Sequence, residues 1–264
     1  MYKTRVEFID VDKSLTAEDG WVGFDMRWVV NENTTGTKLA AIGYAVFPTG
    51  SEHKVHRHEY AEEFVIYMRG KGRRICGDME YEVNPGDIVH TPRGLPHGLK
   101  SVDPGNPIEL FCLYIGASTV ESTGYSLAEV PKNLKKAGDD YRYKTQIDRV
   151  KPDEGFKAGG IDWRWVIDEA SMGSEFGALA YARFAPGAEH KPHRHDHAEE
   201  FVIYTRGKGI RIHDGKEYEV RAGDIVYAPK GTVHGHRNTS GEPLEMWVIY
   251  AGAPSLEKAG YTFV

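Results

Sequence analysis

The stretch HRHDHAEEFVIYTRGKG, residues 193–209, places histidines at alternate positions ahead of a Glu-Glu pair and an apolar segment. A near-copy, HRHEYAEEFVIYMRGKG, stands at residues 56–72, and fourteen of the seventeen positions are identical. A short apolar run rich in β-branched and aromatic residues, closed by glycine, is typical of a strand that ends in a turn. The sequence therefore predicts one strand-and-turn unit built twice.

The similarity between the two copies extends well beyond this stretch. At a spacing of 137 residues, DMRWVV (25–30) meets DWRWVI (162–167). Near the end one residue is lost, and GASTVESTGY (116–125) meets GAPSLEKAGY (252–261) at a spacing of 136. Two repeats of ordinary domain length indicate a duplicated domain rather than a solenoid.

The repeat sets the expected domain boundaries. We expect an N-terminal domain at residues 1–127, a linker at 128–150 and a C-terminal domain at 151–264. The linker is charged, contains Pro131 and has few apolar positions, which favours a short, partly helical connection. Within each copy the segments are short, alternating and bounded by turn residues. The predicted fold class is all-β, with two tandem antiparallel sandwiches or barrels.

Composition excludes several classes of protein. The chain has 264 residues, of which 40% are hydrophobic and 27% charged, an ordinary balance for a folded globular protein. A formal net charge of −6 and the absence of a basic block argue against a nucleic-acid partner. The apolar runs are too short to span a membrane. We expect a cytoplasmic protein, because the chain also has no apolar leader and only two cysteines.

The alternating histidines predict a metal site in each copy. Side chains at positions i and i+2 of a strand point to the same face, so each His-x-His pair converges. One glutamate of each Glu-Glu pair shares that face, and a third histidine follows a Pro-x-Gly bend. The expected ligands are His56, His58, Glu63 and His97, and His193, His195, Glu200 and His234. Three imidazoles and one carboxylate suit Fe(II), Mn(II), Co(II), Ni(II) or Zn(II).

These residues fit a known pattern, because the chain resembles the cupin superfamily. Its first motif, G-x5-HxH-x3,4-E-x6-G, fits Gly50–His56–His58–Glu63–Gly70 and Gly187–His193–His195–Glu200–Gly207. Its second, G-x5-P-x-G-x2-H-x3-N, fits Gly86–Pro92–Gly94–His97 and Gly223–Pro229–Gly231–His234–Asn238, with Ser101 in place of the first asparagine. The resemblance, over roughly residues 22–125 and 159–262, implies a bicupin of two jelly-roll barrels with one metal ion in each.

The two predicted pockets differ in the residues around the ligands. His236 lies two residues beyond His234 and points the same way, whereas Leu99 stands at its counterpart position. Tyr204 shares the inner face of its strand, where its hydroxyl either faces the metal or fills the barrel. Arg164 could bind a substrate carboxylate, or it could be an edge-strand arginine packed over an indole. We therefore take His236, Tyr204 and Arg164 as candidate catalytic residues and favour the second pocket as the catalytic one.

The resemblance leaves the reaction open among several cupin activities. The aromatic and aliphatic pocket strands favour an Fe(II)-dependent dioxygenase acting on a small chelating substrate, such as an aromatic acid or a diketone. One alternative is a non-redox isomerase, decarboxylase or aminohydrolase that uses Mn(II), Ni(II) or Zn(II). The other is a cupin that binds a sugar or another small molecule without catalysis. The expected partner is a small-molecule substrate, with a homodimer left open.

Overall fold

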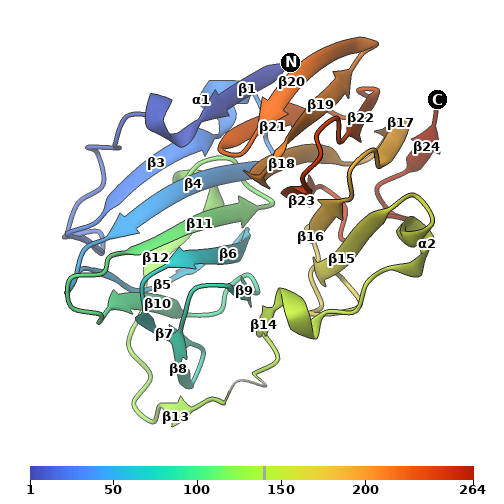
Figure 1. Cartoon of the computed structure of the whole chain (residues 1–264). Helices are drawn as coiled ribbons and strands as arrows, with labels where there is room; N and C mark the ends of the chain where they lie inside the picture. Colours follow the sequence, from blue (N-terminus) through green and yellow to red (C-terminus); the bar gives the residue numbers. More distant parts are fainter. Residues whose placement is uncertain (139–140) are drawn as a thin grey trace. The chain divides into compact units, whose positions relative to one another are not determined.

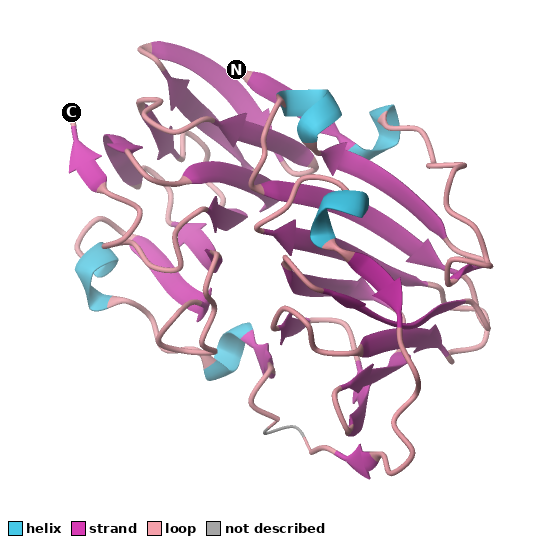
Figure 2. Ribbon diagram, turned by 180° about the vertical axis from the view of Figure 1, so that it is seen from behind, coloured by secondary structure: helices cyan, strands magenta, loops and turns pink. Residues whose placement is uncertain are grey.

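The computed structural model describes residues 1–138 and 141–264 and contains two compact units (Figure 1). The N-terminal unit comprises residues 9–146, and the C-terminal unit comprises residues 1–8 and 147–264. Strands dominate both units, and the helices are single turns (Figure 2). The predicted all-β class is confirmed.

Two sheets form the N-terminal unit. The strands of one sheet are β3 (Asp25–Val30), β4 (Ala40–Phe47), β6 (Glu62–Arg69), β9 (Asp87–Thr91), β11 (Ile108–Ile115) and β14 (Lys144–Gln146). Their spatial order is β14-β9-β6-β11-β4-β3, and all neighbours are antiparallel. The strands of the other are β2 (Trp21–Val22), β5 (Glu52–His58), β7 (Gly72–Cys76), β8 (Met79–Val83), β10 (His97–Ser101), β12 (Tyr125–Leu127) and β13 (Lys135–Lys136). Their order is β12-β5-β10-β7-β8-β13, with β2 also paired to β5. Two short helices, α1 (Glu32–Thr35) and η2 (Glu121–Thr123), complete the unit.

The C-terminal unit repeats this plan. The strands of its first sheet are β1 (Tyr2–Arg5), β15 (Ile161–Ile167), β16 (Gly177–Phe184), β18 (Glu199–Arg206), β21 (Asp224–Ala228) and β23 (Leu244–Ala251), in the order β1-β21-β18-β23-β16-β15. Those of its second sheet are β17 (Glu189–His195), β19 (Lys208–His213), β20 (Lys216–Arg221), β22 (His234–Arg237) and β24 (Tyr261–Phe263), in the order β20-β19-β22-β17-β24. Its short helices are η1 (Val6–Phe8), η3 (Ile147–Arg149) and α2 (Glu154–Lys157).

The first strand of the chain belongs to the C-terminal unit. Strand β1 pairs with β21, placing Tyr2 opposite Tyr227, and β14 pairs in the same way with β9 of the N-terminal unit. The sequence YKT occurs in both segments, at residues 2–4 and 143–145. The compact units therefore differ from the expected domains, whose boundaries followed the ligand repeat alone. The expected linker contains β13, β14 and the helical turn η3, and its residues 139–140 lie outside the described residues.

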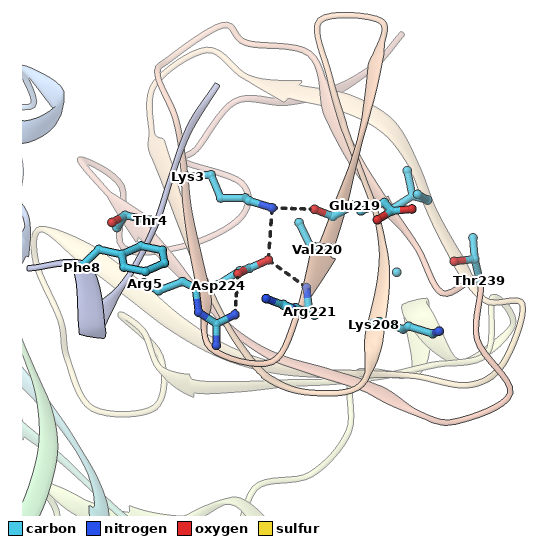
Figure 3. A pocket seen from close by; sticks show the side chains of 12 residues that line it. Lys3, Thr4, Arg5, Phe8, Lys208, Glu219, Val220, Arg221, Asp224 and Thr239 are labelled. Carbon is cyan, nitrogen blue, oxygen red and sulfur yellow. Dashed lines mark hydrogen bonds and ion pairs between the residues drawn. The ribbon is translucent and has the colours of Figure 1, made fainter.

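A buried aspartate anchors β1 to its sheet. Asp224 is 2% exposed, and its carboxylate lies 3.0 Å from a guanidinium nitrogen of Arg5 and 3.4 Å from Nζ of Lys3. It also accepts a hydrogen bond of 3.0 Å from the backbone N–H of Arg221. Figure 3 shows these contacts at one wall of a surface pocket of about 580 Å³, whose lining includes none of the expected metal ligands.

Replacing Asp224 with alanine is expected to destabilise the C-terminal unit by about 2 kcal/mol, because it removes the buried acceptor of the backbone N–H of Arg221 and of two cations. Urea unfolding of the full chain measures this change. Glu7→Ala is the matched control, because Glu7 bonds the same Arg5 from an exposed position and should change stability much less than Asp224→Ala does. Equal effects of the two variants would contradict an anchoring role for Asp224.

The core of each unit lies between its two sheets. On β6 the side chains of Val65 and Tyr67 face this core, and on β18 those of Val202 and Tyr204 do so. Since side chains alternate along a strand, Glu63 shares the face of Val65. A carboxylate is thus carried into each apolar interior. In the described residues, no helix has the length and apolar character needed to cross a membrane.

Candidate metal centres

Four buried side chains meet inside the N-terminal unit. His56 and His58 end β5, Glu63 lies near the start of β6, and His97 begins β10 directly opposite His56. Each offers one nitrogen or oxygen atom, and these atoms lie within 4.8 Å of one another. We call this set the first centre.

The C-terminal unit builds the same arrangement from β17, β18 and β22. His193, His195, Glu200 and His234 are all buried, and their candidate ligand atoms also lie within 4.8 Å of one another. His193 and His234 face each other across the β17–β22 ladder, as His56 and His97 do in the other unit. We call this set the second centre. The structure thus brings together all eight residues expected as ligands.

Backbone carbonyls fix the protonation of two histidines in the first centre. Nδ1 of His56 lies 2.7 Å from the carbonyl oxygen of Lys54, and Nδ1 of His97 lies 2.8 Å from that of Leu95. A carbonyl can only accept, so each Nδ1 carries the proton and each Nε2 keeps a lone pair. Both Nε2 atoms are buried with no hydrogen-bond partner in the described part of the chain. Buried lone pairs that converge in this way fit a bound cation.

The second centre fixes two of its histidines in the same way. Nδ1 of His193 donates to the carbonyl of Lys191 at 2.7 Å, and Nδ1 of His234 donates to that of Thr232 at 2.9 Å. Nε2 of each ring is left for a ligand role.

Burial keeps these imidazoles neutral. It lowers the pKa of His58 to about 3, and it holds the pKa of His56 well below its ordinary value. Burial also lowers the pKa of His193 and of His234. A neutral imidazole is the form that binds metal, so neither centre has to release a proton from these rings at neutral pH.

A buried arginine pairs with the glutamate of each centre. Arg74 Nη2 lies 2.6 Å from Oε1 of Glu63, and Arg211 Nη1 lies 2.7 Å from Oε1 of Glu200. Burial alone would raise the pKa of Glu63, but its electrostatic interactions with His97 and Arg74 outweigh burial and hold that pKa well below the usual range. Both glutamates are therefore ionised. Sequence reasoning missed the arginines, although they are repeated at the spacing of 137 residues.

Two of the three candidate catalytic residues, Tyr204 and His236, are linked to the second centre by hydrogen bonds. The hydroxyl of Tyr204 lies 2.9 Å from Nδ1 of His236, and Nε2 of His236 contacts Arg211. Burial lowers the pKa of His236 to about 3. These two residues thus reach Glu200 through Arg211.

The structure gives Arg164 a different role from the one expected. Its guanidinium donates to both carboxylate oxygens of Asp162 and to the backbone carbonyls of Ile147 and Val150, all at 2.9 Å. Its neighbour Trp163 points into the core, so Arg164 points away from it. The catalytic expectation for Arg164 is therefore corrected to a structural one, which secures the segment before β15.

A histidine–tyrosine pair flanks each centre and was also missed. His53 stacks on His56 with ring centroids 3.8 Å apart, and its Nε2 lies 3.3 Å from the hydroxyl of Tyr125. His190 and Tyr261 repeat this pair beside the second centre at 3.0 Å. The signal was present as EHKVHRH (52–58) and EHKPHRH (189–195), in which a further histidine precedes each motif.

A small cavity of about 20 Å³ adjoins the first centre and is also lined by apolar residues such as Leu99 and Leu110, with space for about one water molecule. A larger pocket of the same unit, which we call the vestibule, has a volume of about 510 Å³ and is lined partly by Trp21, Trp28 and Tyr125. None of the four residues of the first centre lines the vestibule, but the ring of Tyr125 lies 5.0 Å from that of His56. Tyr125 therefore contacts both the vestibule and the first centre.

Comparison with known proteins identifies the family. The Cupin domain family matches residues 43–114 and 180–250, together more than half of the chain. The chain belongs to the cupin family. Because both copies match and each carries a cluster of metal-binding type, it is a bicupin.

Relatives of this bicupin include lyases. Oxalate decarboxylase OxdC of Bacillus subtilis is 24% identical in an alignment 281 positions long. The alignment covers 86% of this chain and 71% of the relative. Dimethylsulfoniopropionate lyase DddW of Ruegeria pomeroyi is 36% identical over 77 residues, which cover 29% of this chain and 50% of the relative. A solved structure of the Bacillus subtilis decarboxylase, described for its Mn(II) centres, is 18% identical with a TM-score of 0.71, covering 96% of this chain and 77% of that one. These relatives support the decarboxylase alternative better than an Fe(II)-dependent dioxygenase.

Proposed function

We propose that this bicupin is a metal-dependent lyase that decarboxylates a small carboxylic acid, with Mn(II) as the preferred ion. The observation that carries the proposal is its likeness to oxalate decarboxylase across both copies, with all eight ligand side chains in place. The relatives in this comparison are named for small carboxylates, oxalate and dimethylsulfoniopropionate. The bound ion would supply positive charge that holds and polarises a coordinated carboxylate.

The charge of each centre supports an anionic substrate. An imidazole binds a metal ion in its neutral form, and the negative charge of Glu63 in the first centre is balanced by Arg74. A divalent ion would therefore leave a net charge of about +2 in a buried site. An anion that brings two charges, such as a dicarboxylate, compensates this charge best, because buried charges are costly unless they are paired.

The vestibule favours the first centre as the catalytic one and supplies a candidate acid. When the substrate loses CO2, the electron pair of the broken C–C bond stays on the remaining carbon, which must then receive a proton. Three carboxylates line the vestibule, those of Asp12, Asp19 and Glu121. Asp12 accepts from the indole of Trp28 and Asp19 from Thr16, whereas Glu121 has no hydrogen-bond partner for its carboxylate among residues 1–138 and 141–264. Glu121 is therefore our candidate proton donor.

Metal analysis and a substrate screen test this function. We expect about two equivalents of manganese per chain and loss of one equivalent in each of His58→Ala and His195→Ala. The exposed His197 lies outside both clusters, so His197→Ala is the control. Dicarboxylic and keto acids should release CO2 in equal amount to the acid consumed, without net oxygen uptake. Oxygen uptake in equal amount to product would overturn the lyase and restore the dioxygenase.

A further inference from the structure

The histidine His58 has a hydroxyl partner for its Nδ1, whereas His56, His97, His193 and His234 have backbone carbonyls. Nδ1 of His58 lies 2.8 Å from Oγ1 of Thr123, and that hydroxyl lies 2.6 Å from the carbonyl oxygen of Val120. A hydroxyl has one proton, and the carbonyl can only accept it. The hydroxyl therefore accepts from His58, whose Nδ1 carries the proton and whose Nε2 lone pair is directed to the first centre.

The second centre lacks this partner. The backbone carbonyl of Thr123 accepts from the N–H of Tyr60 at 2.8 Å, and that of Ala259 accepts from the N–H of His197 at 3.0 Å. Tyr60 and His197 are counterparts at the spacing of 137 residues, so Ala259 occupies the position of Thr123. A methyl group cannot accept a hydrogen bond.

His195 is consequently held less firmly than His58. In the described chain neither ring nitrogen of His195 has a hydrogen-bond partner, although the ring is buried. Aromatic packing does not differ, because Tyr114 lies 4.4 Å from the ring of His58 and Tyr250 lies 4.7 Å from that of His195, measured between centroids. Binding through Nε2 must therefore select one of two tautomers and one ring orientation at the second centre only.

We propose that the first centre binds divalent metal more tightly than the second, and that Thr123 is the positioning residue responsible. Partners that orient a ligand histidine typically change metal affinity by about 10- to 100-fold, and we expect a difference of that size between the centres. The inference rests on metal binding at the two clusters and does not depend on the reaction.

Exchanging the two residues tests the proposal without any enzyme assay. The full chain is freed of metal, and Mn(II) binding is followed by its electron paramagnetic resonance signal and by competition with a chelator. The wild-type protein should show two affinities, of which His58→Ala removes the tighter and His195→Ala the weaker. Thr123→Ala should weaken the tighter site about 10- to 100-fold, whereas Thr123→Ser, which keeps the hydroxyl, should leave it within about threefold.

The reciprocal change strengthens the second centre. Ala259→Ser introduces a hydroxyl beside His195 and should tighten metal binding at the weaker site. The backbone is similar in the two segments, since the next residues, Gly124 and Gly260, have φ angles of 70° and 71°. Melting of the metal-free variants confirms that each is folded. Equal affinities in the wild-type protein, or an unchanged tighter site in Thr123→Ala, would overturn the proposal. If the two metal affinities were as expected but no acid were decarboxylated, only the proposed reaction would be contradicted, and the inference about Thr123 would stand.

Discussion

Replacing Glu63 with alanine is expected to abolish metal binding at the first centre and to destabilise the metal-free N-terminal unit by about 3–5 kcal/mol. The stability loss comes from Arg74, which is 2% exposed and would remain buried without its counter-charge. The thiol of Cys112, 3.3 Å from Oε2 of Glu63, would also lose its acceptor. Urea unfolding in the presence of a chelator measures the change without a contribution from metal binding.

A second variant separates charge from volume. In Glu63→Leu/Arg74→Met both charges are replaced by apolar groups of similar size, and stability should return to within about 1 kcal/mol of the wild type while the first centre still binds no metal. The second centre should keep its one equivalent of metal in both variants. If Glu63→Ala were as stable as the wild type, the ion pair would not be the constraint that the structure indicates.

The ligand sets could be predicted because strand alternation is a strong constraint. A His-x-His pair in a strand puts both rings on one face, and repetition of the same spacing in two copies made chance an unlikely explanation. The glutamate followed from the same alternation, since Glu63 and not Glu62 shares the face of Val65 and Tyr67. Local geometry was sufficient for these residues.

Residues supplied by distant strands could not be predicted in this way. Arg74 lies on β7, and only the folded sheet brings it to Glu63. A charged residue in a short strand ordinarily points to solvent, so RRIC gave no sign of a buried arginine. The sequence did not predict that β1 belongs to the C-terminal unit and that β14 takes the equivalent place in the N-terminal unit, because the repeat was traced only from residue 25. The signal was present, since Tyr2 and Tyr143 begin the same YKT sequence.

The prediction for Arg164 was wrong because the choice of face was not applied to it. Trp163 is 1% exposed and fills the core, so the next residue along β15 must point outward. Its partner Asp162 lies two residues away on the same outer face and was visible in DWRWVI (162–167). A carboxylate at that distance along a strand is a better-supported partner for an arginine than an unknown substrate.

Replacing Glu121, the proposed proton donor, is expected to have a large effect on catalysis. Glu121→Gln keeps the shape of the side chain but removes its acidic proton, so kcat for decarboxylation should fall by about 100- to 10,000-fold. Metal content should not change, because Glu121 is not part of the first centre.

Glu257 provides the matched control for this prediction. It stands at the counterpart position in GAPSLEKAGY (252–261), in the C-terminal unit rather than the N-terminal one. If the first centre performs the reaction, Glu257→Gln should keep kcat within about threefold of the wild type. The reverse result, with activity lost only in Glu257→Gln, would assign the chemistry to the second centre, as His236 and Tyr204 first indicated. Full activity in both variants would contradict the assignment of a proton donor to this segment, and the proton would then have to come from water in the vestibule.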